Sequence, residues 1–144
     1  MRETGRPEGA AAVLHVEDDP VDHGNLRRSF ARWGFAGTLH WAANGEEALA
    51  VLRREGAEAL RPRLIVLDLG MPLMNGLEFL EAAKADPELR GIPIVIFTAS
   101  RHGNDLRRAY ELGAAGYLVK PIDLPAFAEA AGVLARYWTL CEVP

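Results

Sequence analysis

The sequence predicts an α/β protein with a doubly wound, five-stranded parallel sheet between two layers of helices, in the strand order 2-1-3-4-5. First, short apolar, β-prone runs alternate with helical segments five times along the chain. Second, residues 64–67 and 94–97 are apolar throughout, which is typical of strands covered on both faces. Third, the connections between runs suit parallel crossovers. The strand order itself is assigned by analogy with other small doubly wound sheets.

The first strand is expected over residues 11–16. Asp19 then supplies an N-cap, Pro20 occupies the first helical position, and Gly34 ends a helix that reaches about residue 33. Its apolar residues form one stripe that we expect to face the sheet: Leu26, Phe30 and Trp33. The remaining elements are expected as a strand at 38–41, a helix over 45–54 capped by Asn44, a strand at 64–67, a helix over 76–85, a strand at 94–97, a helix from the Asn104 cap to Gly113, a strand over 117–119, and a last helix opened by Asp123 and Pro125.

The composition predicts one domain. A chain of 144 residues with 49% hydrophobic content can bury a single core, and we divide it into a disordered lead-in at 1–10, a domain at 11–135 and an apolar tail at 136–144. The net charge of −4 offers no basic surface for nucleic acid or an anionic membrane. One cysteine, no signal peptide and no long apolar run favour a cytoplasmic protein.

Reactive residues follow four of the predicted strands: Glu17, Asp18 and Asp19 after the first, Asp68 after the third, Thr98 at the end of the fourth, and Lys120 after the fifth. The carboxyl ends of parallel strands share one edge of the sheet, so these side chains should meet there. Crowded carboxylates repel one another unless a cation is present, and oxygen ligands favour Mg²⁺, with Mn²⁺ as a substitute. An ammonium and a hydroxyl can hold phosphoryl oxygens while a carboxylate attacks the phosphorus.

The motifs that carry these residues resemble the response-regulator receiver domain of two-component signalling, over residues 11–135. They are Val16-Glu17-Asp18-Asp19-Pro20, Asp68-Leu69-Gly70-Met71-Pro72 with Gly76, Thr98-Ala99, and Lys120-Pro121. The resemblance implies a flavodoxin-like fold and a stand-alone regulator that accepts a phosphoryl group from a histidine kinase. It also implies output through protein contacts, with catalysis limited to the regulator's own phosphorylation and dephosphorylation.

The same resemblance assigns roles to individual residues. Asp68 would be the phosphoacceptor and a metal ligand, beside Asp18, Glu17 and the backbone carbonyl of Gly70. Further roles follow by position: Lys120 and Thr98 at the phosphoryl group, Thr98 and Tyr117 as the switch pair, and Asp19, Ala99 and Pro121 around the site, with a cis bond common before the proline. Among the histidines, His15 is expected to pack inside its strand, and His23, His40 and His102 at the surface.

A narrower resemblance concerns the end of the chain. The motif at 121–124, Phe127, the aromatic ending at 137–140 and the final Val-Pro pair are similar to single-domain regulators of phytochrome-type histidine kinases. Two apolar stripes run along the last helix, and only one can face the sheet. We therefore expect a homodimer through Tyr137, Trp138 and Leu140. The alternative is a tail folded back over its own domain.

Other functions stay open at this point. A flavodoxin-like cofactor-binding module would share the fold, although acids stand after the first strand where a phosphate loop would be needed. A phosphate sink within a phosphorelay would share the site. A transcription factor is disfavoured, because no segment after the predicted domain could supply a DNA-reading helix.

Overall fold

The computed structural model describes residues 12–56 and 59–142, so the predicted lead-in at 1–10 and the final Val-Pro pair lie outside the described part. Five strands and five helices alternate in it: β1 Val13–Val16, α1 Pro20–Arg32, β2 Leu39–Ala42, α2 Gly45–Leu52, β3 Leu64–Leu67, α3 Gly76–Ala85, β4 Ile94–Thr98, α4 Gly103–Glu111, β5 Gly116–Val119 and α5 Leu124–Leu140. All strand pairs are parallel and the order is β2-β1-β3-β4-β5. The predicted fold class and strand order are confirmed.

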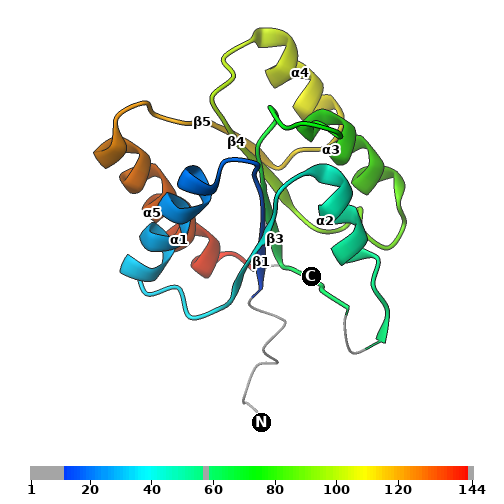
Figure 1. Cartoon of the computed structure of the whole chain (residues 1–144), viewed down its shortest axis with the longest axis horizontal. Helices are drawn as coiled ribbons and strands as arrows, with labels where there is room; N and C mark the ends of the chain where they lie inside the picture. Colours follow the sequence, from blue (N-terminus) through cyan, green and yellow to red (C-terminus); the bar gives the residue numbers. More distant parts are fainter. Residues whose placement is uncertain (1–11, 57–58, 143–144) are drawn as a thin grey trace.

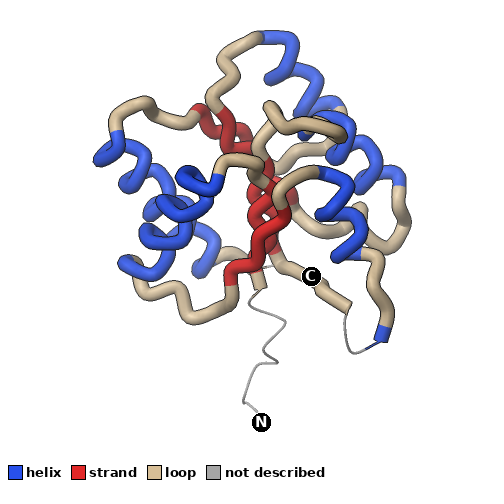
Figure 2. Tube along the Cα trace, viewed as in Figure 1, coloured by secondary structure: helices blue, strands red, loops and turns tan. Residues whose placement is uncertain are grey.

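The sheet is the middle of three layers. Figure 1 shows α1 and α5 together on one face and α2, α3 and α4 on the other, and Figure 2 shows the strands between them. Side chains alternate between the two faces along each strand. In β1, Val13 packs with α1 and α5, whereas Leu14 and Val16 pack with the opposite helices. The two cores fix the direction in which each strand end presents its polar residues.

Several element boundaries differ from the prediction. β2 lies one residue later in the chain than predicted. α2 ends at Leu52, before the predicted end, and Arg53 is its C-cap. Helix α4 begins after His102, which makes no side-chain cap, while Asn104 instead accepts a hydrogen bond from Arg107. Helix α5 continues to Leu140, so the first part of the predicted tail is helical.

Trp33 does not face the sheet as predicted. It is the C-cap of α1, its side chain is 47% exposed, and it lies against Gly132 of α5. A Cβ at Gly132 would overlap the indole Nε1, so only glycine allows this close approach. The guanidinium of Arg136 stacks over the same ring at 4.7 Å. Trp33 therefore packs between α1 and α5 and not on the sheet.

Candidate phosphoryl and metal site

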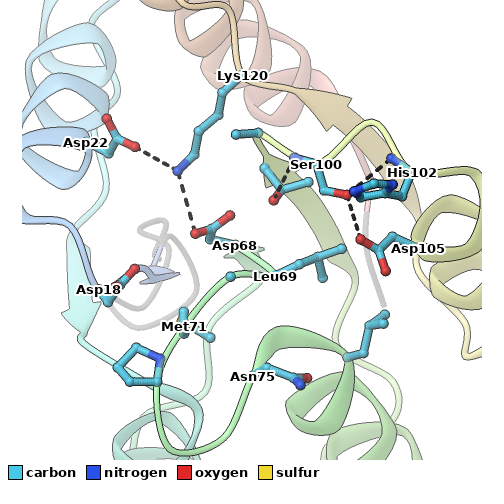
Figure 3. Close-up of a pocket in the computed structure, with 15 residues that line it drawn as sticks. Asp18, Asp22, Asp68, Leu69, Met71, Asn75, Ser100, His102, Asp105 and Lys120 are labelled. Atoms are coloured by element: carbon cyan, nitrogen blue, oxygen red, sulfur yellow. Dashed lines mark hydrogen bonds and ion pairs between the residues drawn. The ribbon is translucent and has the colours of Figure 1, made fainter.

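Three carboxylates meet at the carboxyl edge of the sheet. Glu17 and Asp18 follow β1 and Asp68 follows β3, and these strands pair in register from Val13 to Val16. One oxygen from each carboxylate lies within 4.8 Å of the others. Glu17 and Asp68 are buried and Asp18 is exposed, so the cluster opens to solvent on one side. Figure 3 shows Asp18 and Asp68 in the resulting pocket.

The charge of this cluster favours a cation. Burial and the neighbouring Asp68 raise the pKa of Glu17 to about 7, although its hydrogen bonds with Lys120 and with the backbone N–H of Asp19 act in the opposite direction. A divalent cation among the three carboxylates would offset both causes. The oxygen-only donor set therefore fits a hard divalent ion.

Lys120, directly after β5, reaches across the sheet edge to this cluster. Its Nζ lies 2.6 Å from Glu17 Oε1, 2.7 Å from Asp22 Oδ2 and 3.7 Å from Asp68 Oδ2. Burial alone would lower the pKa of Lys120, but its hydrogen bonds with Asp22 and Glu17 together with the negative charges of Asp68 and Glu17 raise that pKa. The ammonium stays charged and is aimed at the rim where a phosphoryl group would sit.

Asp22 was missed in the reading of the sequence. It lies in the first turn of α1, three residues after the Asp19 cap, and it lines the same pocket. Helical spacing gave no signal for it, because Asp18 lies before the Asp19 N-cap and the four-residue repeat of the helix does not extend to it. Sequence alone could not show that Lys120, from the far end of the chain, would meet it.

The loop between β3 and α3 holds Asp68 against the start of α3. A Cβ at Gly76 would overlap the carbonyl oxygen of Asp68, so glycine is required for this approach. A capping box between Asn75 and Glu78 then begins the helix. Leu73, in the same loop, has a φ of 66°, which is unusual for a residue with a branched side chain. Gly70 is exposed and lines the pocket.

Asp19 and Ala99 stand next to the site residues Asp18 and Thr98 in the chain. Asp19 caps α1 by accepting a hydrogen bond from the Val21 N–H at 2.8 Å. Ala99 lines the pocket beside Thr98. The bond before Pro121 is trans, since no cis peptide bond occurs in the described residues. The expected cis bond is therefore wrong, and trans is also the intrinsically favoured isomer.

Thr98 and Tyr117 are joined through Ser100. The hydroxyl of Thr98 is buried and accepts the Ser100 N–H at 3.4 Å, and the Tyr117 hydroxyl donates to the Ser100 carbonyl at 3.0 Å. The Ser100 hydroxyl donates to Asp105 in the first turn of α4 at 2.5 Å. This chain of hydrogen bonds links the site to α4 and β5, and the link to Asp105 was not predicted.

The prediction for His23 is wrong. Its ring is buried, stacks on Trp41 at 4.7 Å, and its Nδ1 lies 3.0 Å from Nδ1 of His15. Burial lowers the pKa of both imidazoles. Trp41 also donates from its indole nitrogen to the Glu17 carbonyl at 2.6 Å. These aromatic rings support the backbone beside the acidic cluster from the α1 side. His15 is packed inside its strand, as predicted.

A second surface lies along the outermost strand, β5, and the helix α5. An apolar groove of about 500 Å³ runs there, lined by β5 and by Val133, Tyr137 and Cys141 at the end of the chain. Tyr137 is 65% exposed and Leu140 is 81% exposed. Trp138, which was predicted to belong to an interface, also lines this groove, while most of its side chain packs in the core with Phe127. Tyr137 and Leu140 are therefore the more exposed residues of the predicted interface.

Comparisons with known proteins agree with this geometry. The model of the response regulator receiver domain matches residues 13–131. The probable methanogenesis regulatory protein FilR2 of Methanothrix harundinacea is 37% identical over 127 residues, which cover 88% of this chain and 82% of that protein. The response regulator Rcp1 of Synechocystis sp. is 30% identical over 88% of this chain and 87% of its own length.

Solved structures of related proteins have the same fold. The Mn²⁺-bound form of Rcp1 superposes with a TM-score of 0.86 at 29% identity, covering 92% of this chain and 98% of that one. The phosphorylated cyanobacterial phytochrome response regulator RcpA superposes with a TM-score of 0.88 at 30% identity, covering 94% and 99%.

Fold and site together define a phosphoacceptor domain, with an acidic cation site, a lysine and a hydroxyl at the carboxyl edge of a parallel sheet. The chain belongs to the response regulator receiver domain family. Members of this family are phosphoacceptor regulators that interact with histidine kinases. Within the described residues, no helix is long and apolar enough to cross a membrane.

Proposed function

We propose that Asp68 accepts the phosphoryl group. The observation that carries this proposal is the position of its carboxylate, buried beside Glu17 and Asp18 and 3.7 Å from the Lys120 ammonium. A carboxylate oxygen of Asp68 attacks the phosphorus of a phosphohistidine and a new O–P bond forms. The P–N bond breaks, and its electron pair leaves with the imidazole nitrogen of the donor. The product is an aspartyl phosphate on Asp68.

The metal in this proposal is Mg²⁺, with Mn²⁺ as a substitute. The carboxylates of Glu17, Asp18 and Asp68 and the backbone carbonyl of Gly70 would hold it. Bound there, it would neutralise charge on the phosphoryl oxygens. Lys120 and the Thr98 hydroxyl supply the remaining contacts to those oxygens. The similarity to Rcp1, which has been solved in an Mn²⁺-bound form, supports a divalent ion in this chain.

The output of this regulator is a change in protein contacts around α4 and β5. Phosphorylation adds about two negative charges next to Thr98. Movement of the Thr98 hydroxyl toward them would break its bond to the Ser100 N–H and open space for Tyr117, which would move inward by leaving the Ser100 carbonyl. The donor would be a cytoplasmic histidine kinase of the phytochrome type, a proposal supported by the similarity to RcpA and to the bacteriophytochrome response regulator AtBRR. A phosphotransfer profile against candidate kinases tests that choice.

Two further proposals concern assembly and pathway. The groove and the exposed side chains of Tyr137 and Leu140 support a symmetric homodimer through α5. A regulator that only passes phosphate within a relay would use the same site. The hydrogen bond from Ser100 to Asp105 of α4 favours a regulator that signals through its own surface instead.

The first prediction tests the acceptor. Asp68→Asn is nearly isosteric but its amide is not nucleophilic, so the variant should fold and lose labelling by acetyl phosphate in Mg²⁺. Intact-mass spectrometry should show the added phosphoryl mass on the wild type only. The exposed carboxylate variant Glu81→Gln, on α3, serves as the control and should label like the wild type.

Chelation tests the metal in the same assay. Without a divalent cation the crowded acids repel the incoming anion, so the wild type should be labelled weakly and should recover when Mg²⁺ is restored. Equal labelling of the Asp68→Asn variant would refute the acceptor assignment. Undiminished labelling in chelator would refute the metal role.

A further inference from the structure

Asp22 holds one side of the Lys120 ammonium. Its Oδ2 lies 2.7 Å from Nζ, and its side chain is 26% exposed at the wall of the pocket. Figure 3 shows Asp22 and Asp68 on two sides of the lysine, with Asp22 coming from α1 and Lys120 from the end of β5. Asp22 therefore ties the first helix to the last strand across the mouth of the site.

The contacts of Lys120 are unequal. Two short hydrogen bonds, of 2.6 Å to Glu17 and 2.7 Å to Asp22, occupy two of the three N–H groups of the ammonium. The distance of 3.7 Å to Asp68 is too long for a hydrogen bond. The lysine is thus held by hydrogen bonds to Glu17 and Asp22, and it forms only a longer ion pair with Asp68.

A phosphoryl group on Asp68 would change this balance. Its oxygens would need a hydrogen bond from Lys120, whose third N–H group is free to donate it. The two short bonds fix the position of the ammonium, so moving it toward the phosphoryl oxygens would lengthen one of them. Glu17 is buried and belongs to the cation cluster, whereas Asp22 is partly exposed and can be rehydrated when released. Asp22 is therefore the partner that gives way. Its negative charge also opposes the approach of an anionic donor.

We propose that Asp22 is a positioning residue that restrains Lys120 away from Asp68 and thereby slows phosphoryl transfer. This inference rests on the proposed role of Asp68 as acceptor. In the resting domain the restraint keeps the ammonium at the rim, and in the reaction Lys120 exchanges Asp22 for a phosphoryl oxygen. Asp22 acts through the lysine and touches no reacting atom.

The test compares charge removal with charge retention at this position. In saturating Mg²⁺, Asp22→Asn should be labelled by acetyl phosphate about three- to tenfold faster than the wild type, because one charge is removed close to the reacting group. As the new O–P bond to Asp68 forms, the O–P bond of acetyl phosphate breaks and acetate leaves. Asp22→Glu keeps the charge and should stay near the wild-type rate. Glu46→Gln removes an acid from the first turn of α2 instead and should also behave as the wild type.

Two readouts separate restraint from a structural role. The advantage of Asp22→Asn should persist as salt is raised, because salt screens a part-buried ion pair much less than it screens the approach of an anionic donor. Its equilibrium affinity for beryllium fluoride, a phosphoryl mimic, should rise by a similar factor. If Asp22→Asn fails to fold, Asp22→Ser removes the same charge and enters the same assays.

Each outcome separates the two proposals. Labelling of Asp22→Asn at or below the wild-type rate in saturating Mg²⁺ would overturn the restraint by Asp22. An advantage that disappears at high salt would also overturn it, because the effect would then be repulsion of the anionic donor and not restraint of Lys120. Absence of labelling in the wild type, or labelling of Asp68→Asn, would instead overturn the acceptor proposal.

Discussion

Glu17 is the carboxylate whose negative charge is least favourable in this site. Its carboxylate is buried beside Asp68, and its pKa is raised to about 7 even though Lys120 lies 2.6 Å away. One lysine therefore does not compensate for the burial of Glu17 and the charge of Asp68. In the absence of a cation the folded domain binds a proton at Glu17 that the unfolded chain has already lost above its ordinary pKa of 4.5. Stability then falls as the pH rises from about 4.5 to about 7.

The direction of this change in stability with pH gives a prediction for Glu17→Gln. In chelator, the variant should gain stability relative to the wild type as the pH rises through that window, because glutamine has no proton to lose. The gain should be about 3 kcal/mol at most, since each pH unit of displacement corresponds to about 1.4 kcal/mol. Urea unfolding at about pH 5, near the lower end of this window, and at about pH 8, above it, measures the gain in stability. Exposed Glu81→Gln should show no such change.

Mg²⁺ should reverse the comparison. A cation at the cluster stabilises the charged carboxylate, so the wild type should regain stability at the higher pH and exceed Glu17→Gln. A difference between the two proteins that is the same at both pH values in chelator would mean that Glu17 does not carry the charge conflict.

Residue type and position at a strand end were enough to predict that Asp68, Asp18, Thr98 and Lys120 would converge. Each follows or ends an apolar run whose direction the parallel sheet fixes, so the residues meet without knowledge of packing. Asp22 and His23 escaped prediction because they lie on the first turns of α1. Their partners, Lys120 and His15, become apparent only when the helix is docked on the sheet.

At the scale of elements, β4 and β5 connect the site with α4. The Thr98 hydroxyl, the Ser100 backbone and side chain, and Asp105 form a continuous set of hydrogen bonds, with Tyr117 attached at the Ser100 carbonyl. The helix itself lacks a side-chain cap at His102, so Ser100 and Asp105 anchor its first turn. The strand patterns predicted β4 and β5, but the irregular turn that joins β4 to α4 has no periodicity from which to predict these bonds.

Thr98→Ala tests this connection. The variant should still accept a phosphoryl group on Asp68, because the nucleophile and its acidic neighbours are unchanged. Amide hydrogen exchange over α4 should then differ less between the phosphorylated and free forms than in the wild type. Thr98→Ser keeps the hydroxyl and should preserve most of the difference. The same phosphorylation-dependent change in Thr98→Ala as in the wild type would refute the coupling.

At the scale of the whole molecule, the carboxyl ends of the strands and the side of the sheet along β5 differ in chemistry. The carboxyl edge gathers the charged site, whereas the β5 side carries an apolar groove of about 500 Å³ and the outer surface of α5. The two stripes of the last helix were evident in the sequence, and the inward one packs on the core as expected. Which aromatic residue would stay exposed depends on the rotation of α5, which follows from the packing of its inward side chains and from the close approach of Trp33 to Gly132.

The dimer is tested on the exposed part of α5. In sedimentation velocity at tens of micromolar, the full chain should be a dimer, because an apolar patch repeated by a two-fold axis buries itself on both copies. Tyr137→Glu should shift the protein to monomer, since each interface would then bury two carboxylates without partners. Tyr110→Glu alters an exposed tyrosine of α4 and should leave the dimer intact. A monomeric wild type, with or without phosphorylation, would exclude self-association, and a dimer that survives Tyr137→Glu would place the interface away from α5.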